Sequence, residues 1–354
     1  MLGYDSPAGA SVRDRYRRHV EFARAVQRAL QRDRVPARDM IDVQALIFAF
    51  PARPKRLWTD DPPSAQSGSR DAEESVREWE GPARRRGGAY LSMCACLGYD
   101  APYLLEWLEF HRMVGVERLF LYNNGDRDAQ RALLEPYVEE GLVVLYDWTI
   151  SPPLVPAFNH CLRTHRYDAR WIAFIDTDEF LFSPARRPLP DVLTEYERWP
   201  GVGVNGANFG PSGHREQPAG LVVENYIQRL GRLAIKSIVD PVRTTDCPNP
   251  HFFQYANGWA VDENEYPIIG PTTRYVSFSR LKVNHYYTKS EVEFGAKWAR
   301  GRADVVAPRG DAGLAQAVMS TLARFGQTDR EILGYVPELR ARLAARMSPA
   351  ERSG

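Results

Sequence analysis

WIAFIDTDEFLF (residues 171–182) is the stretch of this 354-residue sequence that decides the fold. Its length and its aromatic and β-branched content predict a buried strand. Ionised carboxylates are costly inside such a strand unless they are paired or bound to a metal. Asp176 and Asp178 stand two residues apart, so both point from one face if the chain stays extended there. Two carboxylates on one face at the end of a core strand predict a site for a hard divalent cation, Mg²⁺ or Mn²⁺.

Two other interpretations of these carboxylates stay open. Asp178 or Glu179 could cap a following helix, or the cluster could pair with arginines. The apolar residues in front of the carboxylates favour the metal site.

The composition is that of an ordered globular protein, with 44% hydrophobic residues and 8 tryptophans. The net charge of +1 gives no electrostatic case for a nucleic acid partner. The cysteines lack the paired spacing of zinc sites, and we expect no disulfide framework, which fits a reducing compartment. No segment has the roughly 18–20 apolar residues of a membrane span or a signal peptide's apolar core. We therefore expect a cytoplasmic protein, with peripheral contact at the inner face of the membrane left open.

The two ends of the chain predict helices but show no recognisable chemistry. Residues 11–33 have a helical apolar period with arginines on the other face, which is either solvated or lies on anionic lipid. Residues 51–88 have the Pro, Ser, Gly and charge content of a linker. We expect an N-terminal extension over residues 1–88. Helical patterns at 314–325 and 337–347 predict a C-terminal helical cap over residues 302–354.

The middle of the chain alternates strand and helix patterns. Strands are predicted at 90–97, 116–122 and 142–147, and helices at 101–114, 130–139 and 157–165. This order predicts parallel βαβ units in an open α/β sheet. Ligands of such sheets bind at the carboxyl ends of the strands. Polar clusters fall there at residues 97–100, 123–126 and 176–179.

Five segments resemble, in order, motifs of glycosyltransferase family 92 and related family-2-like glycosyltransferases. They are YDAPYLLEWLEFH (99–111), GV with LYNNG (115–116 and 121–125), FIDTDEF (174–180), FGPSGH (209–214) and NHYYTKS (284–290). The resemblance covers about residues 90–301. It implies a GT-A fold, with an open mixed sheet flanked by helices, in a domain that we place at residues 89–301.

The resemblance also implies a metal and donor site. Asp176 and Asp178 would hold Mn²⁺ or Mg²⁺ together with the donor diphosphate. His285, after a strand expected at 276–283, would complete the metal shell, with His251 as a rival ligand. Glu179 would lie behind the metal or on the acceptor side.

Several residues are candidates for contact with a nucleotide sugar, for which a UDP-sugar is expected. Asp100 would meet the base, and Asn123 with Asp126 or Asp128 would reach base or ribose, unless the latter form a solvated turn. Lys236 and Lys289 would face the diphosphate. Lys297 and Arg300 are either further phosphate contacts or solvated helix charges.

The acceptor side needs a general base of suitable pKa if the reaction inverts the sugar configuration. Asp246 is our candidate, because it falls in a polar loop after a strand, and Glu216, Glu224 and Asp262 are alternatives. His214, in the fourth motif, is expected on the acceptor side.

We therefore expect a metal-dependent, inverting glycosyltransferase that acts on a polysaccharide, a glycolipid or another glycan. A nucleotidyltransferase would have a Gly-rich phosphate loop and lysine after Leu97, which the sequence lacks. A two-metal phosphohydrolase would need more ligands. A non-catalytic glycan- or partner-binding protein on a decayed GT-A fold is the remaining alternative, and the intact Asp176 and Asp178 argue against it.

Overall fold

A computed structural model of the chain describes residues 88–98, 101–125, 127–268, 270–300 and 326–346. The predictions for the N-terminal helix and linker up to residue 87, for Asp100 and Asp126, and for the helix at 314–325 lie outside these residues. The domain boundaries stay predictions.

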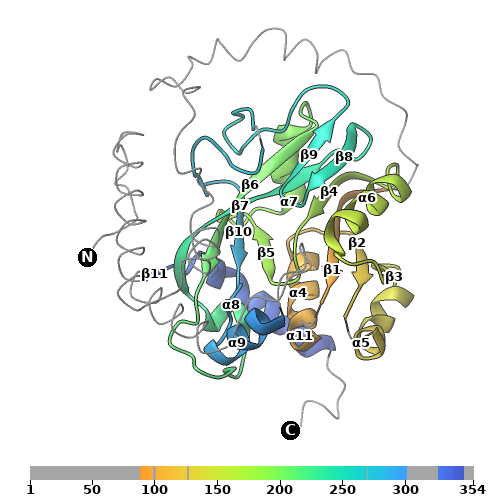
Figure 1. Ribbon diagram of the computed structural model, residues 1–354. Coiled ribbons are helices and arrows are strands. Elements are labelled where there is room, and N and C mark those ends of the chain that lie inside the picture. Colours follow the sequence, from red (N-terminus) through yellow and green to blue (C-terminus); the bar gives the residue numbers. More distant parts are fainter. Residues whose placement is uncertain (1–87, 99–100, 126, 269, 301–325, 347–354) are drawn as a thin grey trace.

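The first half of the described chain has the predicted alternation of strands and helices (Figure 1). The elements are β1 (Ala89–Leu97), α4 (Ala101–Met113), β2 (Arg118–Asn123), α5 (Arg127–Glu139), β3 (Val143–Asp147), α6 (Leu154–Thr164) and β4 (Ala169–Phe174). The four strands are parallel, in the order β3-β2-β1-β4. Gly115 ends α4 as predicted, at a φ of 107° that favours glycine.

The stretch at 171–182 is not the single strand that its composition predicts. β4 ends at Phe174, a turn follows at Thr177 and Asp178, and β5 (Glu179–Phe182) starts a new strand. The Asp176 N–H donates to Glu179 Oε2 at 2.9 Å, and the Glu179 N–H donates to the Asp176 carbonyl at 3.1 Å. These local bonds satisfy backbone and carboxylate groups that a continued strand would leave to the ladder.

The second half adds antiparallel strands, so the sheet is open and mixed, as predicted. It contains β6 (Gly201–Phe209), β7 (Gln228–Val239) and β10 (Lys282–His285), and the strand order continues β4-β7-β6-β10-β5. β11 (Gln327–Thr328) pairs with β7, and β8 (Thr244–Asn249) and β9 (Phe252–Tyr255) form a separate small sheet. The short helices α7 (Leu189–Leu193), η1 (Thr194–Tyr196) and α8 (Val222–Asn225) connect these strands.

The strand expected at 276–283 is shorter and lies later in the sequence. The N–H groups of Ser279, Arg280 and Leu281 donate to the Glu263 carboxylate at 2.8–3.0 Å. Because this buried carboxylate satisfies them, the backbone joins the sheet only at Lys282. His285 is consequently the last residue of β10 and does not follow the strand.

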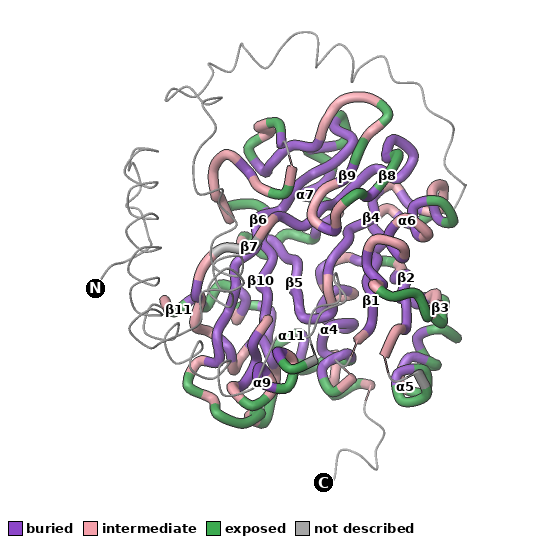
Figure 2. The backbone as a smooth tube through the Cα atoms, in the orientation of Figure 1, coloured by how far each residue is buried: buried purple, intermediate pink, exposed green. Residues whose placement is uncertain are grey.

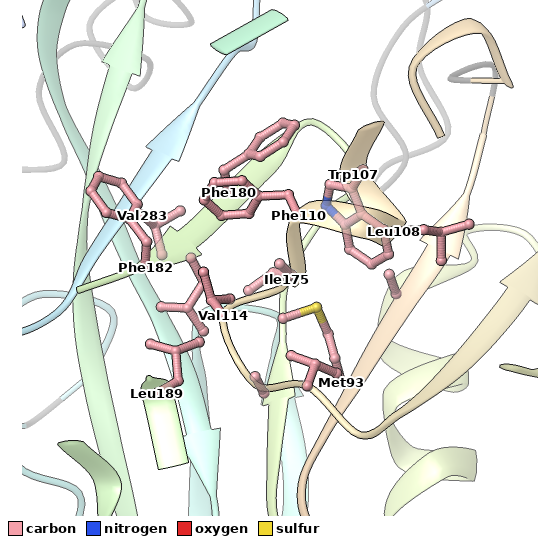
Figure 3. Packing of buried hydrophobic residues seen from close by; sticks show 14 of the residues in the cluster. Met93, Trp107, Leu108, Phe110, Val114, Ile175, Phe180, Phe182, Leu189 and Val283 are labelled. Carbon is pink, nitrogen blue, oxygen red and sulfur yellow. The ribbon is translucent and has the colours of Figure 1, made fainter. Parts of the chain in front are cut away.

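The strands of the sheet are mostly buried (Figure 2), and their side chains contribute to two separate apolar clusters, one on each face. On one face, Trp107 and Phe110 of α4 pack against Phe180 and Phe182 of β5 (Figure 3). On the other face, α6 and the β8-β9 hairpin contribute Phe158, Cys161 and Cys247. The four cysteines, Cys94, Cys96, Cys161 and Cys247, are buried free thiols.

The last described helix of the chain packs against the first described helix. α9 (Glu291–Arg300) follows β10, and η2 (Glu331–Tyr335) leads into α11 (Val336–Arg346), close to the helix predicted at 337–347. α11 lies against α4 (Figure 1), and Arg346 Nε donates to Glu109 Oε1 at 3.0 Å. Among the described residues, no helix has the length and apolarity that a membrane crossing requires.

Candidate active site

Carboxylates and cations meet where β4 ends, β5 begins and β10 ends. The β4-β7 register sets Phe174 beside Ser237, which brings Lys236 to the carboxyl edge of β4. The β10-β5 register sets His285 directly opposite Glu179. The sheet thus brings together residues that lie more than a hundred positions apart. We call Asp176, Asp178, Glu179, Lys236 and His285 the carboxylate cluster.

Lys236 holds two of the three carboxylates. Its side chain is buried, and its Nζ lies 2.8 Å from Asp176 Oδ2 and 3.1 Å from Glu179 Oε2. Burial lowers the pKa of Lys236, but the two carboxylates raise it more, so the net shift is upward and the lysine stays charged. Lys236 is therefore a fixed cation that orients Asp176 and Glu179.

Glu179 is fully buried, and its Oε1 has no hydrogen-bond partner in the structure. Burial raises the pKa of Glu179 to about 7, and the nearby charge of Lys236 opposes the shift. The carboxyl is consequently close to half protonated at neutral pH.

Asp178 is surrounded by cations. Its Oδ2 pairs with Lys297 Nζ, and its Oδ1 lies 3.3 Å from His285 Nε2. Burial on its own would raise the pKa of Asp178, but the charges of Lys297, His285 and Lys289 hold it well below its usual range. Asp178 is therefore ionised, and its charge is already balanced.

The orientation of His285 matters for what can lie beside Asp178. Its Nδ1 is 2.8 Å from Asn208 Oδ1, an acceptor, so Nδ1 carries a hydrogen and donates. In the neutral ring Nε2 then presents a lone pair to Asp178 Oδ1. Two facing acceptors at 3.3 Å are stable only with a positive centre between them, which is either a proton on Nε2 or a metal ion.

These atoms fit a divalent cation. Two neighbouring ligands of an octahedral ion at about 2.1 Å are about 3 Å apart, close to the 3.3 Å between Asp178 Oδ1 and His285 Nε2. Asp176 Oδ1 is buried without a hydrogen-bond partner. Within the described residues no three His, Cys, Asp or Glu side chains form a ready metal cluster, so water and phosphate oxygens would supply the remaining ligands.

A second group of side chains lies beside the cluster, around the start of α9. Lys289 has a φ of 50°, an uncommon backbone conformation for lysine, and its Nζ lies 4.2 Å from the centre of the Tyr103 ring. The hydroxyls of Tyr103 and Tyr226 donate to the two oxygens of Glu293. The ring of His214 contacts that of Tyr226 edge-on at 5.7 Å. Tyr103, Glu293 and Tyr226 thus link Lys289 to His214 through side-chain contacts, and the donor and acceptor roles of the two residues stay predictions.

Sequence reasoning missed Asn208, Tyr103, Tyr226 and Glu293. The pattern Ser290-x-x-Glu293 is a capping-box signal for α9 that could have identified Glu293. In the structure Ser290 Oγ donates to Glu293 Oε2 at 2.6 Å, and the Glu293 N–H donates back to Ser290 Oγ at 3.3 Å. Asn208 had no such signal, because only the β6-β10 pairing places it beside His285.

Other candidates lie apart from this cluster. Asn123 is buried at the end of β2, and Asp128 is exposed in the first turn of α5. His251 Nδ1 lies 3.1 Å from the Ile235 carbonyl oxygen and donates to it. Arg300 ends α9, and its side chain lies outside the described part of the structure.

Asp246 is exposed on β8. It lines a hollow of about 260 Å³, and none of the lining residues belongs to the carboxylate cluster: Asn159, Leu162, Arg163, Arg166, Thr244, Thr245 and Asp246. Asp246 therefore lines a different hollow from the one where the carboxylate cluster would bind a metal ion.

The alternative bases have structural partners or are exposed. Asp262 Oδ1 accepts the N–H groups of Asn264 and Tyr266, and burial raises the pKa of Asp262 to about 6. Glu224 pairs with Arg340, and Glu216 is exposed.

Comparison with known proteins identifies relatives of this chain. The sequence profile of Glycosyltransferase family 92 matches residues 89–308. A Glycosyltransferase family 92 protein of Oryza sativa subsp. japonica is 32% identical over 203 residues, which cover 55% of this chain and 33% of that protein. One from Arabidopsis thaliana is 29% identical over 191 residues, covering 49% and 33%.

A more distant relative has an activity in its name. A galactan beta-1,4-galactosyltransferase of Arabidopsis thaliana is 27% identical over 104 residues, which cover 27% of this chain and 20% of that protein. The chain spans about a third of the length of the two family proteins above, at 33% of each.

Proposed function

Since this chain belongs to glycosyltransferase family 92, we propose that it transfers a sugar from a nucleotide-sugar donor to a glycan acceptor. The observation that carries the proposal is the close approach of Asp178 Oδ1 and His285 Nε2, 3.3 Å apart, beside Asp176 Oδ1, which has no hydrogen-bond partner. A nucleotide sugar leaves a nucleoside diphosphate, whose developing negative charge needs positive groups at fixed positions. This cluster offers such positions at the edge where ligands of α/β sheets bind.

Asp176, Asp178 and His285 would hold Mn²⁺ or Mg²⁺. When bound, the ion would neutralise the charge that develops on the donor diphosphate. Asn208 fixes the His285 tautomer so that Nε2 faces the ion, and Lys236 fixes the Asp176 carboxylate. Lys289 and Lys297, whose charges already act on Asp178, would contact an incoming phosphate.

The donor and the stereochemistry are proposed from the family alone. We propose a UDP-sugar as donor, a polysaccharide, glycolipid or other glycan as acceptor, and inversion at the sugar carbon. Inversion needs one base at the acceptor hydroxyl, for which Asp246 stays the candidate. Asp246→Asn should then lower kcat by about 100-fold or more with donor binding unchanged. An unchanged kcat would remove Asp246 from the mechanism.

Calorimetric titration of UDP-, GDP- and dTDP-sugars tests the donor site. The native protein with Mn²⁺ should bind one nucleotide class, and EDTA or the Asp176→Ala/Asp178→Ala variant should abolish that binding. Glu265→Gln is a matched control, because Glu265 is a carboxylate paired with Arg198 at 2.6 Å outside the cluster. If the native protein bound none of the donors with any divalent metal, a non-catalytic glycan-binding role would replace this proposal.

A further inference from the structure

Lys297 lies beside the carboxylate cluster and is held less tightly than Lys236, the lysine inside it. Lys236 has 2% of its side chain exposed and lies between two carboxylates. Lys297, on α9, has 31% exposed, pairs with Asp178 Oδ2, and lies with its Nζ 4.1 Å from the centre of the Tyr287 ring. A half-exposed lysine is flexible and loses little when it changes partner.

The position of Lys297 conflicts with a metal ion at Asp178. A lysine on Oδ2 and a divalent cation on Oδ1 would lie on one carboxylate a few ångströms apart, where like charges repel strongly. Asp178 itself is 7% exposed and cannot turn away into solvent. When a metal ion binds Asp178, Lys297 is therefore the group that can move away.

The ring of Tyr287 already contacts Lys297 while the lysine pairs with Asp178. The Tyr287 ring contacts the His285 ring at 5.2 Å, so the face that Lys297 already touches borders the cation position. A cation over an aromatic face is attracted by the electrons of the ring. Lys297 can therefore leave Asp178 without leaving the site.

We propose that Lys297 neutralises Asp178 from Oδ2 until a nucleoside diphosphate arrives, and then shifts its charge to the diphosphate as the metal binds at Oδ1. The inference rests on the proposed function, because it requires metal and diphosphate to bind at Asp178. It makes their binding cooperative: the metal alone must displace Lys297, whereas the diphosphate gives Lys297 a new anionic partner. By linkage each of the two ligands strengthens the other.

The test is the sign of two binding changes in Lys297→Met, which keeps an apolar side chain of similar length. Calorimetry with Mn²⁺ alone should show about tenfold tighter binding than in the native protein, because the competing charge is gone. Calorimetry with UDP at saturating Mn²⁺ should show about tenfold weaker binding. A lysine with a merely structural role would not move the two affinities in opposite directions.

Three further variants keep the test decisive. Lys297→Arg keeps the charge and should match the native Mn²⁺ affinity. Lys297→Gln is a second neutral variant that replaces Lys297→Met if the latter does not fold. Arg198→Met is the matched control: Arg198 also pairs with a carboxylate, Glu265, and lies over an aromatic ring, Trp199, but outside the carboxylate cluster.

Two results would overturn the inference, and they can be told apart. If the native protein binds Mn²⁺ and UDP but the neutral variants bind Mn²⁺ no more tightly, Lys297 is not a competitor, and the proposed function stands. If the native protein binds neither UDP nor Mn²⁺, the proposed function fails and the inference fails with it.

Discussion

At the scale of the residue, Glu179 couples the site to protein stability. Its pKa rises from the usual 4.5 to about 7 on folding, so the native state keeps a proton that the unfolded chain releases between these values. Stability from this group is complete below pH 4.5 and is lost as the pH rises towards 7, by up to about 3 kcal/mol.

Glu179→Gln should therefore reduce the fall in the free energy of unfolding between pH 5 and pH 8 in metal-free buffer. Part of the fall should persist, because burial also raises the pKa of Glu106 to about 7. Urea unfolding at several pH values measures the slope. An unaltered slope in Glu179→Gln would mean that Glu179 is ionised in the native state.

Asp178 and His285 also show which features of the site can be predicted from the sequence and which cannot. Their chemistry and their place at the end of a strand are predictable, because both stand in motifs and both adjoin apolar runs. Their partners Asn208 and Lys297 are not, because these contacts depend on strand register and on the path of α9. The role of Asp246 stays a prediction, and the structure places this residue among α6 side chains.

At the scale of the element, α9 positions both Lys297 and the capping residue Glu293. Ser290→Ala removes the side-chain cap of this helix, whose oxygen accepts the Glu293 N–H. The free energy of unfolding should fall by about 1 kcal/mol.

Thermal or urea unfolding measures this loss, with Ser277→Ala as the control. The Ser277 hydroxyl bonds the hydroxyl of Ser279, which is exposed, so its removal should change stability by less than about 0.5 kcal/mol. Equal losses in the two variants would contradict a capping role for Ser290.

The parallel half of the sheet follows directly from sequence, because each βαβ unit forms from neighbouring segments with a clear apolar period. The antiparallel half does not, since β4 pairs with β7 more than sixty residues later. The composition of residues 171–182 also does not predict the break between the two strands there. Its apolar residues suit one long strand, and only the hydrogen bonds between Asp176 and Glu179 end it.

At the scale of the whole molecule, residues 326–346 belong to the same core as the family-matched region. Ile332, Val336 and Leu339 are buried in the cluster that contains Trp107 and Phe180. The family match ends at residue 308, so the folded unit extends beyond it.

Lys282 joins these two parts. Its fully buried Nζ lies 2.5 Å from Asp329 Oδ2 and 2.7 Å from Glu331 Oε2. Lys282→Met should lower the free energy of unfolding by about 3 kcal/mol, because it leaves the buried Asp329 carboxylate without its main partner. Lys282→Met/Asp329→Asn should recover part of this loss. Urea unfolding of both variants checks the pair, and a double variant less stable than Lys282→Met would argue against it.

The central claim is that Asp178 and His285 hold a cation at the donor diphosphate. Anomalous diffraction from crystals grown with Mn²⁺ and UDP measures this directly. We expect one manganese peak within about 2.5 Å of Asp178 Oδ1 and His285 Nε2, in contact with the diphosphate. Bound UDP with no manganese at these two atoms would contradict it.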